Sequence, residues 1–579
     1  MPVVHIDGQS YEFEKGQTLL QFCLDIGIEL PHFCYHPALS VPANCRQCLV
    51  KAGSPAQNRV TGEVVVDERG NPVINYFPKL QTSCSLGMTD GMVVHTHRDN
   101  EEVAGAQEDN LEFLLINHPL DCPICDQAGH CPLQNLAYKY GPEGSRFEFE
   151  KVHKPKRVEL GPRVTLDAER CINCTRCTRF TDEISKSNQL AIMLRGVSNY
   201  PMTAPGETFD DAYSMNVVDI CPVGALTSTD FRFKARVWEM SKTPSISVYS
   251  SKGVNVDYWV RDNLIVQITP RTNIGVNDYW MADSDRLSYH HFNENRPQNG
   301  AETRSGDGSL VPSAWADGFA TAADILKQAD PSTILFVGSS HATVEDNYLL
   351  KRLAEVLGAS APIFLAHVEE GSGDQWLVSD DRAPNAAGCR LLGLEEISGE
   401  QLRTRIADAN VVYAMEEDLI GHGGLTPEEL EEKSIVLHYY NTTNHTLPHA
   451  RVAFPTAMAV ETVGTMVNVD GIAQRLRPAK AIKSINRSLV MEMGRSRPDD
   501  HGTPFDHWHN ESNTIDCHPS WELLQKVAAA AGVELEFKSP SAILDEVASS
   551  VDSFGGLSYE RMGQSGVRLQ AEEATSGQQ

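Results

Sequence analysis

The placement of the cysteines constrains this 579-residue chain more than any other feature. Of its 14 cysteines, eleven fall between Cys34 and Cys221, and seven of these eleven stand in Cys-x-x-Cys spacings. Such spacing brings several sulfur donors to one point, and in a reducing compartment it indicates metal ligands more than disulfides. Cys23, Cys389 and Cys517 stand alone, and each is expected to be a small buried apolar residue.

Charge and hydropathy restrict the partners. The formal net charge of −29 argues against nucleic acid or an anionic membrane surface as the main partner. The first residues lack a basic segment followed by an apolar run, and no stretch of about eighteen uncharged apolar residues occurs. We therefore expect no signal peptide and no transmembrane segment, so that the chain meets a membrane only by docking on other subunits.

The middle cysteine group is a short loop. Cys122, Cys125 and Cys131 lie within ten residues, and proline follows two of them, which favours an irregular loop over a helix or strand. A four-coordinate cluster needs one more donor, and no other cysteine is left nearby. His118, four residues before Cys122, is the predicted fourth ligand, and His130 is the competing donor.

Two segments frame this loop. Residues 106–117 are predicted to form a helix with several leucines on one face, and this helix delivers His118 at its end. The basic segment 151–157 is predicted to be a solvated linker without a site.

The first cysteine group follows a recognisable series of elements. Residues 3–14 alternate as two strands around a turn at Asp7-Gly8, and Thr18 caps a predicted helix over 19–24. A cysteine loop and a strand over 92–95 come next. The four cysteines on this series are Cys34, Cys45, Cys48 and Cys84.

This order of elements resembles the β-grasp ferredoxins that hold a 2Fe-2S cluster. Ten residues separate Cys34 from Cys45, where plant-type ferredoxins have four, so the loop is longer without losing a ligand. Between Cys48 and Cys84 we predict an inserted hairpin with strands at 64–66 and 73–75.

The third cysteine group resembles half of a bacterial ferredoxin. Residues 171–177 contain the first three cysteines of its run, but Thr181 stands where the fourth would be. A later Cys-Pro pair supplies one more thiolate, so the four thiolates are enough for one 4Fe-4S cluster. The candidate ligands are Cys171, Cys174, Cys177 and Cys221.

The order of the three sites resembles the N-terminal region of the large iron-sulfur subunit of bacterial NADH-quinone oxidoreductase, respiratory complex I. The mitochondrial counterpart is the 75 kDa subunit, and the resemblance covers roughly residues 1–235. One departure is that Ala128-Gly129-His130 stands where the loop usually has two consecutive glycines, which affects loop shape and not the ligands. The resemblance implies that a 2Fe-2S cluster is held by Cys34, Cys45, Cys48 and Cys84, one 4Fe-4S cluster by His118, Cys122, Cys125 and Cys131, and a second 4Fe-4S cluster by Cys171, Cys174, Cys177 and Cys221.

The resemblance also implies a function. The chain would relay single electrons from the FMN of a partner subunit through its clusters towards quinone, coupled in the whole complex to proton translocation. Its partners would be the peripheral-arm subunits, including the FMN/NADH-binding subunit and downstream iron-sulfur subunits, on the cytoplasmic side of the bacterial inner membrane. The sequence has no Gly-x-Gly-x-x-Gly or Walker A motif and no nucleophile triad, so we expect no catalytic residue on this chain.

The second half reads as α/β, with strand and helix signals alternating from about residue 240. Segments 381–388 and 461–471 resemble molybdopterin oxidoreductases. Residues 222–388 contain no cysteine, so the cluster that those enzymes carry there cannot form, and we expect an inactive scaffold without molybdopterin. The tail from Gln570 is predicted to be disordered.

These predictions add up to a multidomain α/β and α+β chain with five parts. In order they are a β-grasp 2Fe-2S domain over 1–97, a histidine- and cysteine-ligated 4Fe-4S domain over 98–150, a ferredoxin-like 4Fe-4S domain over 151–238, a molybdopterin-oxidoreductase-like scaffold over 239–535, and a partly disordered extension over 536–579.

Other classes share some of these features. The same cluster order occurs in the iron-sulfur subunits of NAD-linked hydrogenases, which are shorter, and in iron hydrogenases, which carry further cysteines beyond this point. A formate dehydrogenase complex is a further alternative, disfavoured by the missing cysteine cluster. Structural zinc in the Cys-x-x-Cys sites would leave the ferredoxin-like order unexplained.

Overall fold

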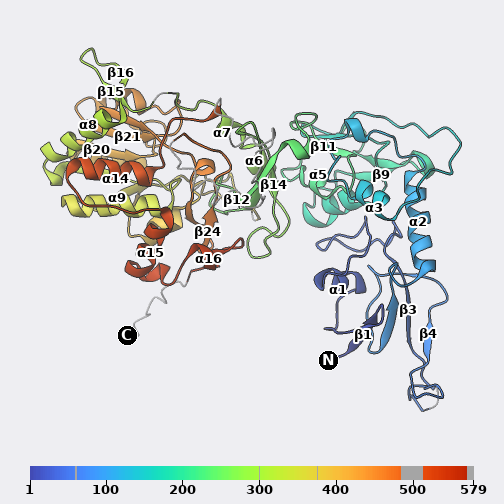
Figure 1. The fold of residues 1–579 in the computed structure, drawn as a ribbon. Coiled ribbons are helices and arrows are strands. Elements are labelled where there is room, and N and C mark those ends of the chain that lie inside the picture. The colour runs from blue at the N-terminus through green and yellow to red at the C-terminus, as the bar shows by residue number, and fades with distance from the viewer. Residues whose placement is uncertain (59–60, 299, 375, 484–512, 570–579) are drawn as a thin grey trace. The chain divides into compact units, whose positions relative to one another are not determined.

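The computed structural model describes residues 1–58, 61–298, 300–374, 376–483 and 513–569. Within it the chain forms two compact units, unit 1 over Met1–Trp238 and unit 2 over Glu239–Gln579 (Figure 1). The tail that the sequence predicts to be disordered, 570–579, lies outside the described residues.

Unit 1 begins with a twisted sheet of order β2-β1-β6-β3-β4, with β5 paired to β3. The predicted hairpin at Asp7-Gly8 is confirmed, because β1 and β2 pair antiparallel on either side of it. The predicted cap is also confirmed, since the Thr18 side chain accepts a hydrogen bond from the amide of Gln21. The elements are β1 (Val3–Ile6), β2 (Gln9–Glu12), α1 (Leu19–Asp25), β3 (Leu49–Pro55), β4 (Ile74–Tyr76), β5 (Gln81–Thr82) and β6 (Met92–His95).

The inserted hairpin is less regular than the sequence predicts. Val64 and Val66 form only isolated bridges, to Gln57 and Pro72. The two predicted segments do pair, but over a shorter length, since the Val73 amide donates to the Val65 carbonyl at 2.8 Å and Val66 bridges Pro72. The end of the second segment joins the main sheet, because β4 pairs antiparallel with β3.

The helix before the middle cysteine loop is longer than predicted. It begins at Glu101 and not at 106, because Asn100 caps it by accepting a 3.1 Å hydrogen bond from the amide of Val103. The remaining elements of unit 1 are α2 (Glu101–Leu115), η1 (Cys122–Ile124), α3 (Pro132–Tyr140), β7 (Val158–Glu159), β8 (Val164–Leu166), α4 (Arg176–Arg179), η2 (Phe180–Ile184), β9 (Ala191–Met193), η3 (Gly196–Ser198), β10 (Tyr200–Met202), α5 (Asn216–Ile220), β11 (Leu226–Ser228) and η4 (Val237–Glu239).

Unit 2 is built on an eight-stranded sheet of order β16-β15-β22-β21-β20-β17-β18-β19. The six strands from β22 to β19 are parallel, and β15 and β16 add an antiparallel edge. The strands are β15 (Glu302–Arg304), β16 (Leu310–Pro312), β17 (Ile334–Val337), β18 (Ile363–Leu365), β19 (Glu395–Ile397), β20 (Val411–Met415), β21 (Ser434–Tyr439) and β22 (Val452–Pro455).

Helices cover both faces of this sheet. Val411 and Tyr413 of β20 belong to one apolar core, whereas Val412 and Ala414 belong to another, as expected when both faces of a strand are buried. Helices α8, α9, α10, α14 and α15 pack into the first core, and α11 and α12 into the second. Their bounds are α8 (Trp315–Gln328), α9 (Val344–Leu357), α10 (Ala386–Leu391), α11 (Gly399–Asp408), α12 (Pro427–Leu430), α14 (Ser520–Ala531) and α15 (Pro540–Ser550).

Two smaller sheets complete unit 2, β12-β13-β14 and β23-β24-β25. The α/β character predicted for this half is confirmed, whereas its likeness to molybdopterin oxidoreductases stays a prediction. The remaining elements are β12 (Ser241–Ile246), β13 (Asn255–Arg261), β14 (Leu264–Pro270), α6 (Asp283–Leu287), α7 (His290–Asn293), η5 (Pro331–Thr333), η6 (Leu447–His449), η7 (Ala459–Glu461), β23 (Gly464–Val467), β24 (Ile472–Leu476), η10 (Asp552–Phe554), α16 (Tyr559–Met562) and β25 (Val567–Arg568).

Candidate metal centres

The first cysteine group lies on the loop between α1 and β3 and on the turn after β5. Cys34, Cys48 and Cys84 are buried, and Cys45 is half-buried. The thiols pair by hydrogen bonds, Cys34 with Cys45 and Cys48 with Cys84, and the bond with Cys34 lowers the pKa of Cys45 to about 6. The structure therefore brings the four predicted sulfurs of this group to one place.

The backbone turns sharply beside the second cysteine of the first and third groups. Ala43 and Arg46 adopt φ of 51° and 57°, and Asn173 and Thr175 adopt φ of 51° and 61°. Residues with side chains rarely enter this left-handed region, and alternating right- and left-handed residues turn successive amides towards one point. Such amide-lined turns favour anionic groups, including iron-sulfur centres.

The second group lies on the loop between α2 and α3. Cys125 and Cys131 are buried and Cys122 is exposed, and their charges act on one another. His118 Nδ1 is buried and has no hydrogen-bond partner among the described residues. Burial lowers the pKa of His118 to about 4, so its imidazole is neutral, as a metal ligand must be. His130 is exposed, so an orphaned buried nitrogen beside three cysteines favours His118 as the fourth donor.

The third group surrounds one cavity. Its four predicted ligands line this cavity together with apolar side chains such as Leu166 and Leu226. Burial raises the pKa of Cys171 to about 11 and that of Cys174 to about 12. These thiols keep their protons at neutral pH unless a metal displaces them, so the donor set fits a buried metal cluster.

The second and third groups meet at the segment that begins with Cys221. The thiol of Cys131 donates a long hydrogen bond of 3.7 Å to the carbonyl of Pro222. A Cβ atom on Gly224 would clash directly with Cys125 Sγ. Only glycine lets the middle loop approach this closely.

A buried arginine joins the same two groups. Arg170 precedes Cys171, and its side chain is 4% exposed. Its Nε donates a 3.0 Å hydrogen bond to Asp121, which precedes Cys122, and its Nη1 donates to the Gly224 carbonyl at 3.4 Å. The guanidinium group thus fixes the spacing between the two cysteine loops.

Two more arginines join the first and third groups. Arg179 Nη2 donates to the carbonyl of Cys34 at 2.5 Å and to that of Cys174 at 3.4 Å. Arg176 donates to the carbonyls of the residue after Cys34 and of the residue before Cys221. The sequence patterns used above did not predict a role for these arginines, although the repeat Cys-Thr-Arg-Cys-Thr-Arg places one two residues after each of two cysteines.

The basic segment 151–157 is a mostly exposed connection, as the sequence predicts, but some of its lysines have fixed partners. Lys151 Nζ donates to the carbonyl of Leu115 at 2.9 Å, at the carboxyl end of α2. Lys156 Nζ contacts Asp121 at 2.6 Å and Glu169 at 2.5 Å. These contacts have a physical reason, because carbonyls at a helix end and carboxylates with little solvent access attract cations.

Three family models match unit 1. A 2Fe-2S iron-sulfur cluster binding domain matches residues 3–99, the NADH-ubiquinone oxidoreductase-G iron-sulfur binding region matches 107–146, and the ferredoxin-like domain of NADH-quinone oxidoreductase subunit 3 matches 161–227. The chain is therefore a multidomain iron-sulfur protein, which confirms the predicted class of cofactor.

Relatives carry the predicted family name. The G subunit of NADH-quinone oxidoreductase from Rickettsia conorii is 37% identical over 357 residues, 62% of this chain and 49% of the relative. The NADH-ubiquinone oxidoreductase 75 kDa subunit of Reclinomonas americana is 38% identical over 359 residues, 62% of this chain and 48% of the relative. The inferred resemblance is confirmed, and the chain spans about half the length of the curated relatives that it matches.

A solved structure is also similar to part of the chain. A chain from a crystal structure of NAD+-reducing [NiFe]-hydrogenase in the H2-reduced state matches with a TM-score of 0.33 and 29% identity, covering 41% of this chain and 91% of that one.

Among the described residues, no helix combines the length and apolar character that a bilayer crossing needs.

Proposed function

We propose that this chain is the electron-transfer subunit of an NADH:quinone oxidoreductase of the complex I type. It would pass single electrons from the FMN of a partner subunit towards quinone, coupled in the whole complex to proton translocation. One observation carries the proposal: three metal-type donor groups lie in one compact unit and are joined by buried arginine hydrogen bonds. The hydrogenase and formate dehydrogenase alternatives have less support, because the relatives named above are quinone-linked.

The proposal assigns twelve ligands to three clusters, which carry single electrons when bound. The 2Fe-2S cluster would be held by Cys34, Cys45, Cys48 and Cys84, one 4Fe-4S cluster by His118, Cys122, Cys125 and Cys131, and the other by Cys171, Cys174, Cys177 and Cys221.

The chain's own residues would space these sites and set their environment. Arg170 holds the two loops that would carry the 4Fe-4S clusters, and Arg179 holds the 2Fe-2S loop against the third group. Their positive charges favour electron addition nearby, and burial of most of the thiols limits the access of water. The orphaned nitrogen of His118 adds a neutral ligand, which leaves its cluster one charge less negative than four thiolates would.

Unit 2 would act as a scaffold without molybdopterin. Cys389 and Cys517 are each fully buried, as the sequence predicts for isolated apolar cysteines. The five predicted domain ranges are part of this proposal. So are the partners, which are the FMN/NADH-binding subunit and downstream iron-sulfur subunits, and the location on the cytoplasmic side of the bacterial inner membrane.

The test is Cys174→Ser in the assembled enzyme. We expect loss of quinone reduction, while NADH oxidation by an artificial acceptor at the flavin continues, because the break lies beyond the flavin. Cys23→Ser is the matched control, since Cys23 is a fully buried cysteine of the same unit outside the three groups. Normal quinone reduction in a folded Cys174→Ser enzyme that lacks the cluster would overturn the relay.

A further inference from the structure

The parallel sheet of unit 2 contains a topological switch point. Strand β17 pairs with β18 on one side and with β20 on the other, so the chain runs in opposite directions across the sheet from β17. In open α/β sheets, ligands bind at the carboxyl ends of strands at such a point. The residues just beyond these strand ends therefore form a candidate ligand-binding site that belongs to unit 2 alone.

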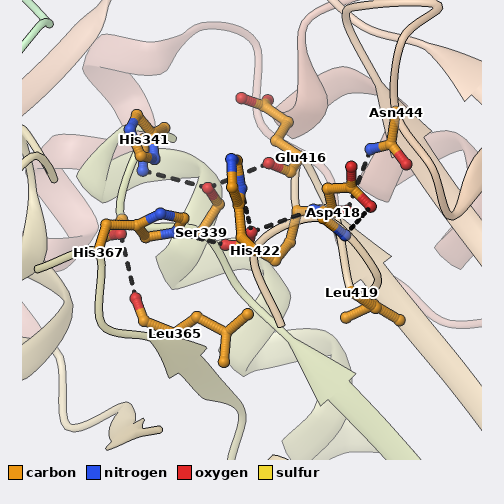
Figure 2. Close-up of polar contacts among 12 residues, drawn as sticks. Ser339, His341, Leu365, His367, Glu416, Asp418, Leu419, His422 and Asn444 are labelled. Carbon is orange, nitrogen blue, oxygen red and sulfur yellow. Dashed lines mark hydrogen bonds and ion pairs between the residues drawn. The ribbon is translucent and has the colours of Figure 1, made fainter. Parts of the chain in front are cut away.

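Two histidines and a glutamate gather at these strand ends. His367 follows β18, Glu417 follows β20, and His422 stands on the loop after Glu417. His367 Nε2 lies 3.0 Å from one carboxylate oxygen of Glu417, and His422 Nδ1 lies 3.2 Å from the other. Figure 2 shows the imidazoles of His367 and His422 close together, with His341 beside them. The ring centroids of His367 and His422 are 4.8 Å apart.

The Glu417 carboxylate is almost fully buried, with 1% of its side chain exposed. Within the described part of the chain its ion pairs are with the two imidazoles, and the amide of Asp418 also donates to it at 3.0 Å. A buried carboxylate needs a compensating cation. Either a protonated imidazole or a metal ion bound by all three side chains provides one.

The spacing fits a shared ion. The three donor atoms all lie within 4.8 Å of one another. Ligand atoms that bind one zinc ion tetrahedrally at about 2.0–2.1 Å lie roughly 3.4 Å apart, which is inside this spacing. Two imidazoles and a carboxylate, without a thiolate, form a donor set typical of zinc and related divalent ions.

The site also has an entry path. The His422 side chain is 55% exposed and lines a cavity of about 340 Å³, together with polar residues such as Asp418 and Asn444. Figure 2 shows Asp418 beside His422, with Asn444 beyond Asp418. An ion from solvent can therefore reach His422, behind which Glu417 and His367 lie outside the cavity lining, and water can complete its coordination.

We propose that His367, Glu417 and His422 form a binding site for a divalent transition metal of the zinc class. The site uses no residue of the three cysteine groups, so it goes beyond the proposed function and does not depend on it.

The test is zinc binding to the full chain. Anaerobically purified protein is dialysed against buffered Zn²⁺, and zinc, iron and labile sulfide per chain are measured on the same sample. Wild-type protein should bind one zinc more than Glu417→Gln and His422→Ala. His445→Ala is the matched control and should bind as wild type does, because His445 lines the same cavity but pairs with Asp418.

X-ray absorption at the zinc edge separates this site from zinc in vacant cysteine groups. The bound ion should show nitrogen and oxygen neighbours at about 2.0–2.1 Å, whereas cysteine sulfurs would lie at about 2.3 Å. Equal zinc content in wild type and in both folded variants, or a shell of sulfur alone, would overturn the proposal. Iron and sulfide report on the clusters separately, so failure of one proposal is distinguishable from failure of the other.

Discussion

Unit 1 buries mainly thiols among its ionisable groups, whereas unit 2 buries more carboxylates, several of which have hydrogen-bond partners in the chain. Cys174 and Cys177 are buried with their pKa raised by burial. In unit 2 the buried Glu345 accepts hydrogen bonds from the amide and hydroxyl of Thr465, each at 2.8 Å, and from the hydroxyl of Tyr559 at 2.7 Å. The Glu345 carboxylate is thus satisfied within unit 2, while the buried thiols of unit 1 fit metal partners that the polypeptide does not supply.

Removal of the clusters should have the largest effect, because it should destabilise unit 1 and leave unit 2 unchanged. When iron and sulfide are extracted anaerobically, we expect the unfolding midpoint of unit 1 to fall by more than about 10 °C, because metal binding is coupled to folding. Unit 2 should unfold as before. Calorimetry with limited proteolysis, assigning cleavage to either side of residue 238, measures both. Equal destabilisation of the two units would contradict the comparison.

Gly224→Ala tests the packing between the second and third groups. The added methyl would clash with Cys125 Sγ, so we expect loss of up to about eight irons per chain while the 2Fe-2S signal stays. The matched control is Gly105→Ala within α2, where a Cβ has no neighbour within 4 Å. That control should keep all its iron and gain up to about 1 kcal/mol of helix stability.

Arg296→Met tests the internal pairing of unit 2. Arg296 is 3% exposed and pairs with Glu461, which has no exposed surface. Removing one partner of a buried pair costs about 3–5 kcal/mol, and Lys480 at 3.8 Å still compensates part of the Glu461 charge, so unit 2 should lose up to that much unfolding free energy with unchanged iron content. Arg390→Met breaks an exposed pair and should cost less than about 1 kcal/mol. Similar losses in the two variants would show that burial does not govern these pairs.

Arg179→Met should have the smallest effect. Loss of a cation that bonds the carbonyls of Cys34 and Cys174 makes electron addition nearby less favourable. We expect midpoint potentials to fall by about 20–40 mV, equivalent to roughly 0.5–1 kcal/mol for one electron. Redox titration followed by electron paramagnetic resonance measures this, with the exposed Arg157→Met as control. Identical midpoint potentials in the two variants would show that Arg179 does not influence the potentials of the clusters.

Short sequence patterns correctly predicted several local elements of the fold. The Asp7-Gly8 turn and the Thr18 cap each lie where the sequence predicts. The α2 start was wrong because Gly105 weakens the helical pattern, while the Asn100 cap and the burial of Val103 and Gln107 extend the helix.

Contacts between residues far apart in the sequence were not predicted, because no local sequence pattern encodes them. Gln47 Nε2 donates to the backbone carbonyl of Gln107, and Gln107 Nε2 donates to the backbone carbonyl of Leu49, each at 3.0 Å, which ties α2 to the end of the first cysteine loop. Arg170 reaches Asp121 across 49 residues, and the left-handed turn at Thr175 uses a residue that gives no such signal. Spacing predicts the cysteine donors, but the orphaned nitrogen of His118 is visible only in three dimensions.

The most direct test of the twelve-ligand assignment is iron and acid-labile sulfide per chain on anaerobically purified protein, with electron paramagnetic resonance of the reduced sample. The account predicts about ten irons, from one 2Fe-2S and two 4Fe-4S centres. Zinc in place of iron at the cysteine groups, or no labile sulfide after anaerobic handling and cluster reconstitution, would contradict it.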